Sequence, residues 1–161
     1  MCGISVCLSS DTAFSAEYAK NSLNLLRHRG PDVSAVWQDE GIAIIHTRLS
    51  IQDLSEAGNQ PMSSSNGRYI ISFNGEIYNH LELRKRYLTE HRFRGHSDTE
   101  TVIELFQIMG ADCFSKMVGM WAVVIWDISA KELFISRDRY GQKPLYWAKI
   151  GRASCRERVC T

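Results

Sequence analysis

The sequence predicts an α+β fold with antiparallel sheets, and three observations support this prediction. Short apolar or alternating segments, which are typical of strands, follow one another closely and are joined by turns. Helical patterns are few, and they do not alternate with the strands as they do in a repeated β-α-β unit. The chain has 161 residues, of which 44% are hydrophobic and 23% are charged, so we expect one globular domain with a hydrophobic core.

The strands are predicted from alternation and from apolar runs. In the first one, Ile4, Val6 and Leu8 fall on one face. A short turn at residues 39–41 joins two further strands into a hairpin, and residues 127–131 join another pair. The predicted strands are residues 2–8, 33–38, 41–46, 69–73, 120–126, 132–136 and 145–148.

Three segments are predicted to be helices. Residues 15–27 have apolar side chains at helical spacing and are followed by Gly30-Pro31, which ends the helix. Residues 79–88 form a second helix. A third begins at the capping box 97–100, while residues 51–66 are predicted to be loop.

Composition excludes several classes of protein. The first ten residues have no basic region of a signal peptide, and no apolar run approaches the roughly 20 residues of a membrane helix. Five scattered cysteines, without a CxxC pair, favour neither a zinc site nor a disulfide framework. We therefore expect a soluble, cytoplasmic protein that binds no metal and has no membrane partner.

Residues 150–161 differ from the rest of the chain, with three arginines, one glutamate and no period. They resemble a reading frame of a sequencing adapter, and we expect a non-native tail, which resequencing the source DNA would test. Without it the formal net charge changes from +1 to −1, because three arginines and one glutamate are lost. The alternative is an ordinary basic tail, and in neither case do we infer a nucleic-acid partner.

The first three residues are Met1-Cys2-Gly3. If Met1 is removed, a thiol and a free α-amine lie on the same Cα, and both titrate near enough to neutrality to exchange a proton. Such a residue supplies its own base, which is the principle of an N-terminal nucleophile. The alternative is that Cys2 is a small buried apolar residue.

Other polar residues lie near the ends of predicted elements, where sites are often built. Residues 27–32 concentrate three cations, which suit either a site or a charged helix end. Arg48 can clamp a carboxylate or lie in solvent. Asn74 and Gly75 suit a turn or a two-donor oxyanion hole, and Asp98 lies in the first turn of a helix, where acids are ordinarily structural.

Several motifs occur together in order: Met1-Cys2-Gly3-Ile4, residues 27–32, residues 48–53, Gly58-Asn59-Gln60-Pro61, residues 74–79, residues 97–100, Gly119-Met120-Trp121 and residues 137–146. With these motifs the chain resembles, over residues 1–149, the class II glutamine amidotransferase domain of glutamine-hydrolysing asparagine synthetases. The resemblance implies the four-layer αββα sandwich of N-terminal-nucleophile hydrolases, built from two antiparallel sheets. We expect this sandwich to be truncated at its C-terminus, with an unpaired sheet edge and exposed apolar surface.

The resemblance also implies residue roles. Cys2 would attack the glutamine side-chain amide, giving a γ-glutamyl thioester and ammonia, and then glutamate. Asn74 and the Gly75 N–H would stabilise the oxyanion, while Arg48 and Asp98 would bind the α-carboxylate and α-ammonium groups of glutamine. The full substrate-binding set that it implies is Arg48, Leu49, Ser50, Ile51, Gln52, Asn74, Gly75, Glu76 and Asp98. Gln52 departs from the apolar residue usual at its position.

The partners implied by the resemblance are L-glutamine and a synthetase domain on the same chain, and a homodimeric full-length enzyme is compatible with it. This domain needs no cofactor, whereas ATP and Mg²⁺ belong to the synthetase domain, whose Ser-Gly-Gly-Leu-Asp-Ser loop does not occur in the sequence. Three interpretations remain open. They are a glutaminase half-enzyme of asparagine synthesis, a non-catalytic remnant of that fold, and a fragment of a phosphoribosyl or sugar-phosphate amidotransferase.

Overall fold

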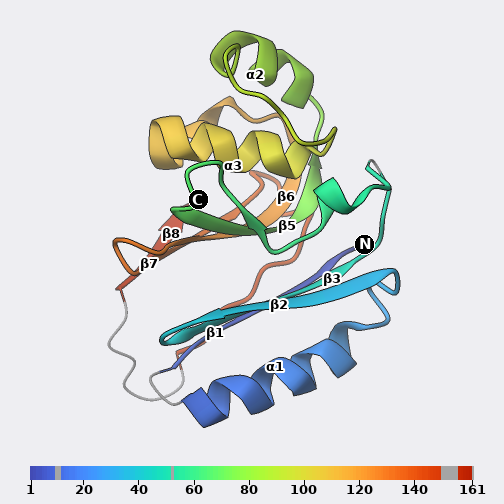
Figure 1. Ribbon diagram of the computed structural model, residues 1–161, viewed down its shortest axis with the longest axis vertical. Coiled ribbons are helices and arrows are strands. Elements are labelled where there is room, and N and C mark those ends of the chain that lie inside the picture. Colours follow the sequence, from blue (N-terminus) through green and yellow to red (C-terminus); the bar gives the residue numbers. More distant parts are fainter. Residues whose placement is uncertain (10–11, 52, 150–155, 161) are drawn as a thin grey trace.

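A computed structural model describes residues 1–9, 12–51, 53–149 and 156–160, with the backbone alone for residues 12–15 and 156–160. The elements form four layers (Figure 1): helix α1 (Thr12–Leu26), a three-stranded sheet, a five-stranded sheet, and helices α2 (His80–Tyr87) and α3 (Asp98–Met109). The α+β class and the expected αββα layers are confirmed. In this part of the chain, no helix is both long enough and apolar enough to cross a membrane.

The three-stranded sheet has the order β1 (Gly3–Leu8), β3 (Ile42–Arg48), β2 (Val33–Asp39), and both pairs are antiparallel. The predicted hairpin is confirmed, but β3 runs on to Arg48. Helix α1 covers the outer face, where Ala19 packs on Ala43 and Ile45. The side chains of Ile4, Val6 and Leu8 pack on the opposite, inner face, as their alternation predicts.

The five-stranded sheet has the order β4 (Met62–Ser63), β5 (Tyr69–Ile77), β6 (Gly119–Asp127), β7 (Glu132–Arg137), β8 (Arg156–Cys160). Its pairs are antiparallel except β7 and β8, which are parallel. Strand β8 falls within residues 150–161 and occupies the edge beside β7, where an unpaired edge was expected. Two 3₁₀ helices, Glu56–Gly58 and Gly110–Lys116, complete the elements, so the predicted loop 51–66 contains a short helix and a short strand.

The strand predicted at residues 145–148 is wrong, because residues 142–149 form no regular structure. The Asp138 carboxylate accepts hydrogen bonds from the backbone N–H groups of Tyr140, Gln142 and Lys143. The chain after β7 is therefore held in a turn. Tyr146, 90% exposed, lies beyond this turn.

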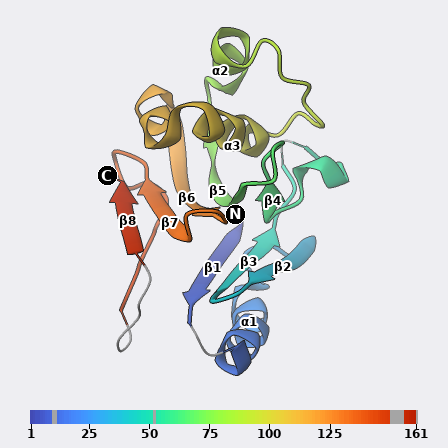
Figure 2. The ribbon, with the colours of Figure 1, turned by 60° about the vertical axis from the view of Figure 1, so that its left-hand side comes forward.

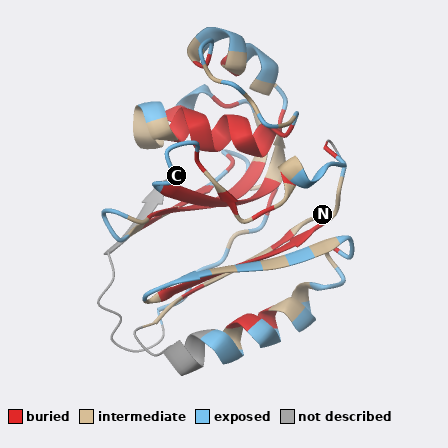
Figure 3. Ribbon diagram, viewed as in Figure 1, coloured by how far each residue is buried: buried red, intermediate tan, exposed pale blue. Residues whose placement is uncertain are grey.

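Besides the small cluster under α1, two larger apolar cores lie on the two faces of the five-stranded sheet. One lies between the sheets and includes Ile42 and Ile44 of β3 with Val124 and Trp126 of β6. The other lies under α3, whose buried face meets the five-stranded sheet, whereas α1 is exposed along its outer side (Figure 3). His46 crosses between the sheets, with its Nδ1 2.8 Å from Ser72 Oγ. Burial, together with the nearby Arg48 charge, lowers the pKa of His46 to about 3, so the imidazole is neutral.

The predicted capping box at the start of α3 forms only in part. Ser97 is the N-cap, and its Oγ accepts a hydrogen bond from Thr99 N at 3.1 Å. The Glu100 carboxylate instead accepts from the backbone N–H groups of Arg94 and Gly95 at 2.9 and 3.1 Å. Glu100 thus ties the loop before α3 to the first turn of that helix.

Candidate active site

A cavity of about 80 Å³ lies where the N-terminus meets the ends of the two sheets. Figure 2 shows the N-terminus close to β4 and β5. Four elements supply the chemistry-bearing residues: Cys2 precedes β1, Arg48 ends β3, Gly75 lies in β5 and Asp98 begins α3. The cavity is lined by Cys2, Arg48, Leu49, Ile51, Asp53, Gly58, Gln60, Phe73, Gly75, Ser97, Asp98 and Thr99.

Cys2 is half-buried, and its thiol donates to the carbonyl oxygen of Leu49 at a distance of 3.8 Å. Arg29 Nε donates to the Cys2 carbonyl oxygen at 3.2 Å, so the cluster at residues 27–32 contacts the backbone of the candidate nucleophile. Gly3, the next residue, pairs with Thr47 in β3. A Cβ at Gly3 would lie 2.5 Å from Thr47 Oγ1, so this position is too close-packed for a larger residue.

The Arg48 guanidinium is buried, with 6% of the residue exposed. Its Nη1 donates to the Ser55 carbonyl at 3.0 Å and to Asn59 Oδ1 at 2.6 Å, and its Nη2 donates to the Asp53 carbonyl. Nε–H and the second Nη2–H have no hydrogen-bond partner among the residues that the structure describes. Two donors on adjacent nitrogens match the two oxygens of a carboxylate.

Asp98 is the first residue of α3 and is 5% exposed. Its Oδ2 accepts from the backbone N–H of Ile77 at 2.9 Å. Burial raises the pKa of the Asp98 carboxyl to about 6, and the nearby Glu76 adds to the rise, while backbone N–H groups oppose it. A buried carboxyl with a raised pKa favours a cationic partner, and such groups are common in functional sites.

Asn74 and Gly75 do not form a turn after the strand, because both lie within β5 opposite Ala122 and Trp121. A Cβ at Gly75 would overlap the carbonyl oxygen of Met120, so β6 approaches too closely for any other residue. Asn74 is buried but does not line the cavity. Its side chain makes no hydrogen bond to another described residue.

The other predicted residues divide into three groups. Leu49 and Ile51 line the cavity, whereas Ser50 and Glu76 do not, and the Ser50 N–H donates to Asp32 Oδ2 at 2.8 Å. Gln52 lies outside the described residues. Nor does the described part of the chain contain a group of three or more His, Cys, Asp or Glu side chains that could hold a metal ion.

Several lining residues had no role predicted for their own side chains: Asp53, Gly58, Gln60, Phe73, Ser97 and Thr99. Gln60 shows what such a residue does. Its Oε1 accepts from Phe73 N at 2.6 Å, and its Nε2 donates to Thr99 Oγ1 at 3.2 Å. One buried amide thus links β5 to α3 beneath the cavity. The motif 58–61 was the one signal in the sequence that pointed to this residue.

The chain is similar to longer proteins of two kinds. It is 37% identical over 160 residues to the amidase chry2 of Gibberella zeae, covering 91% of this chain and 24% of that protein. It is 38% identical over 142 residues to the glutamine-hydrolysing asparagine synthetase 1 of Bacillus subtilis, covering 88% of this chain and 22% of that protein. The chain therefore spans about a quarter of the length of these curated relatives.

The fold is similar to that of a solved structure, the glutamine phosphoribosylpyrophosphate amidotransferase of Bacillus subtilis. The TM-score is 0.72 at 19% identity, over 94% of this chain and 40% of that one. The family model described as the glutamine amidotransferase domain matches residues 1–156, nearly the whole chain. Because this match includes every element that lines the cavity, the chain belongs to the glutamine amidotransferase family, in its class II branch.

Proposed function

We propose that this chain hydrolyses L-glutamine to glutamate and ammonia, with Cys2 as the nucleophile once Met1 has been removed. The observation that carries the proposal is the composition of one cavity. It brings together a thiol at the N-terminus, two guanidinium donors of Arg48 that no described residue accepts from, and the buried carboxyl of Asp98. A free amino acid has the complementary groups, an α-carboxylate and an α-ammonium.

Recognition precedes the chemistry. Arg48 Nε–H and Nη2–H bind the α-carboxylate, and ionised Asp98 accepts from the α-ammonium. Two opposite charges fixed on different elements distinguish an amino acid from a simple amide, because a ligand that lacks either group leaves one of them unpaired. The glutamine side chain then extends toward Cys2.

The reaction proceeds in two stages. The α-amine of Cys2 takes the thiol proton as Sγ attacks the amide carbon, and the Gly75 N–H and the Asn74 amide donate to the developing oxyanion. The carbon–nitrogen bond breaks, the amine returns the proton to the leaving nitrogen, and ammonia departs from a thioester. Water then adds to the thioester, which releases glutamate and restores the thiol.

Asn74 must turn toward the cavity to take this part. Its amide makes no hydrogen bond to another described residue, so the turn would break no such bond. Gly75 needs no such change, because it already lines the cavity.

The ammonia, in this proposal, passes to an ATP-dependent amidation of the asparagine synthetase type. Support comes from the asparagine synthetase relatives, which are about four times as long as this chain, and ATP and Mg²⁺ would bind in the additional part. The amidase relatives match equally well, so the similarity by itself does not identify the nitrogen acceptor. Product analysis with the complete reading frame and aspartate as acceptor tests it.

The glutaminase proposal is tested on chain whose loss of Met1 has been verified by intact mass. We expect glutamate release from glutamine and stoichiometric labelling by a diazoketone analogue of glutamine. Cys2→Ala abolishes both, whereas Cys7→Ala, a buried cysteine on the α1 side of the sheet, retains both. Glutamate release by the Cys2→Ala variant, or an unlabelled parent chain with a free terminal amine, would favour the non-catalytic interpretation and overturn the proposal.

A further inference from the structure

We propose that Asp53 is a positioning residue for glutamine recognition, because its single carboxylate fixes both the loop that holds Arg48 and the loop that carries Asp98. The inference rests on the proposed function of this cavity and adds a residue to it. Asp53 lines the cavity and is 8% exposed.

The first half of the link runs to Arg48. Asp53 Oδ1 accepts from the Ser55 backbone N–H at 2.9 Å and from Ser55 Oγ at 2.6 Å, which closes a tight turn. That turn directs the carbonyl groups of Asp53 and Ser55 at the Arg48 guanidinium. A Cβ at Gly58 would overlap Arg48 Nη2, so the same loop also packs closely on the guanidinium.

The second half of the link runs to Asp98. Asp53 Oδ2 accepts from the His96 backbone N–H at 2.9 Å, two residues before Asp98. This oxygen also packs against Gly95, where a Cβ would lie 2.5 Å from it. Loop residues 94–97 are therefore held on the cavity side by Asp53.

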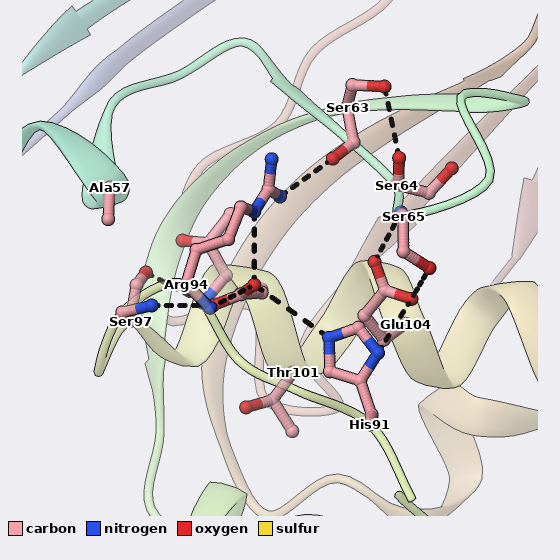
Figure 4. Close-up of polar contacts among 12 residues, drawn as sticks. Ala57, Ser63, Ser64, Ser65, His91, Arg94, Ser97, Thr101 and Glu104 are labelled. Carbon is pink, nitrogen blue, oxygen red and sulfur yellow. Dashed lines mark hydrogen bonds and ion pairs between the residues drawn. The ribbon is translucent and has the colours of Figure 1, made fainter.

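The same loop is held on its far side by other groups. Arg84 donates to the carbonyl groups of Gly95 and Ser97 at 3.1 and 2.7 Å. Arg94 donates to the Ser63 carbonyl at 2.9 Å. Before this loop, His91 Nδ1 lies 3.6 Å from Glu104 Oε2, and Figure 4 shows the two side chains next to each other. These contacts fix the loop to α2, α3 and β4. Asp53 links it to the Arg48 loop by a hydrogen bond, and Gly95 also packs against Ala57 of that loop.

The Asp53 carboxylate is held in its ionised form, which is the better hydrogen-bond acceptor. Hydrogen bonds from the Ser55 hydroxyl and the His96 N–H, with the Ser55 N–H and the Arg48 charge, lower the pKa of Asp53 to about 2, against the opposing effect of burial. Asp53 therefore stays ionised at pH values where Asp98 titrates. Its position sets the separation between the two charges that meet the ends of one amino acid.

The test separates binding from chemistry. Asp53→Asn keeps an acceptor for Ser55 but replaces the acceptor for His96 N–H with an amide nitrogen. In full chain lacking Met1, we expect the diazoketone concentration for half-maximal labelling to rise at least about tenfold, with the maximal rate within about twofold of the parent. Gly95→Ala, whose added Cβ crowds Asp53 Oδ2 and Ala57 Cβ without changing the charge of Asp53, should shift half-maximal labelling in the same direction.

Glu104→Gln is the matched control. Glu104 is even more deeply buried than Asp53, and its carboxylate accepts two hydrogen bonds from Ser65 (Figure 4). It does not line the cavity. It should lose stability without a shift in half-maximal labelling. Equal shifts in Asp53→Asn and Glu104→Gln, or a slower maximal rate at unchanged half-maximal concentration, would overturn the inference.

Calorimetric titration of L-glutamine into Cys2→Ala, alone and combined with Asp53→Asn, distinguishes this inference from the proposed function. An unreactive parent chain whose Cys2→Ala variant binds glutamine about tenfold more tightly than the double variant refutes the hydrolysis and supports the inference. Equal affinities of the two variants refute the inference, whatever the activity of the parent.

Discussion

The two sides of the cavity are built differently. Cys2 and Gly75, on the side proposed for the reaction, belong to or adjoin strands whose backbones are held by ladders of hydrogen bonds to β3 and β6. The Arg48 guanidinium and Asp98, on the side proposed for recognition, depend on loops 53–59 and 94–97. Those loops are held by side chains that bind backbone groups.

This difference predicts which property a mutation on each side of the cavity should change. A ladder distributes support over many backbone bonds, so deletion of one side chain leaves the strand in place, and a change of the backbone itself is needed to disturb it. A loop held by a few side chains loses a large share of its support when one of their carboxylates is removed. Side-chain changes should therefore alter glutamine affinity, and backbone changes should alter folding and chemistry together.

The largest effect is expected at Gly75. In Gly75→Ala the added Cβ overlaps the Met120 carbonyl and approaches Trp121 Cα to 2.8 Å, and both are backbone atoms that cannot turn away. We expect a loss of about 3 kcal/mol in the free energy of unfolding and no measurable glutaminase activity. Urea titration checks this.

Gly67→Ala is the comparison for Gly75→Ala. A Cβ at Gly67 meets nothing within 4 Å, but φ is +72°, so a cost of about 1 kcal/mol is expected. A Gly75→Ala variant as stable as Gly67→Ala would contradict the role assigned to close strand packing.

A smaller effect is expected at Asp98, where one substitution should lower kcat/KM for glutamine but raise the stability of the unliganded chain. Asp98→Asn removes the acceptor for the α-ammonium, so kcat/KM for glutamine should fall about 100-fold, mainly through KM. Because burial raises the pKa of the Asp98 carboxyl, its ionised form costs stability, and the neutral amide should stabilise the unliganded chain at pH 8 by about 2 kcal/mol.

The pH dependence gives an independent check on Asp98. Its raised pKa makes a contribution to stability that is fully present below pH 3.8 and is lost as the pH rises through about 6. Glutamine binding to the Cys2→Ala variant should weaken in the other direction, about tenfold per pH unit below 6, as the carboxylate is protonated. A flat binding profile between pH 5 and 7 would argue against Asp98 as the ammonium acceptor.

The smallest effect is expected at His46, between the sheets. Because its pKa is lowered from 6.5 to about 3, the unfolded chain binds a proton in this range and the native chain does not. The contribution to stability is present above pH 6.5 and is lost as the pH falls toward 3, by about 1 kcal/mol per unit. His46→Gln should reduce this acid sensitivity in urea titrations at pH 7 and 5.

Much of the fold and part of the cavity could be predicted from the sequence. Alternation of Ile4, Val6 and Leu8 identified the inner face of β1, and the capping residue Ser97 identified the start of α3. Cys2, Arg48 and Asp98 were singled out near the ends of separate elements, and the structure places all three around one cavity. Local sequence patterns are enough to find a site residue when it lies at the end of a helix or strand, because the pattern predicts where that element ends.

The rest depended on contacts distant in sequence. Asn-Gly is a local turn signal, but at Asn74 and Gly75 pairing with β6 overrides it. The hydrogen bond between Asp53 and His96 spans 43 residues, and Asp53 followed by Ser55 resembles an ordinary loop turn. Residues 145–148 have the apolar character of a strand, but they follow the turn held by Asp138 and pair with no strand among the described residues.

Asp53 and Glu100 hold their loops largely through backbone amides in the protein interior. Dissolved ions screen exposed pairs, such as Lys131 with Asp39, but screen buried contacts much less. Loops 53–59 and 94–97 should therefore keep their arrangement in concentrated salt solutions, so the protein can be purified at high ionic strength without displacing these loops.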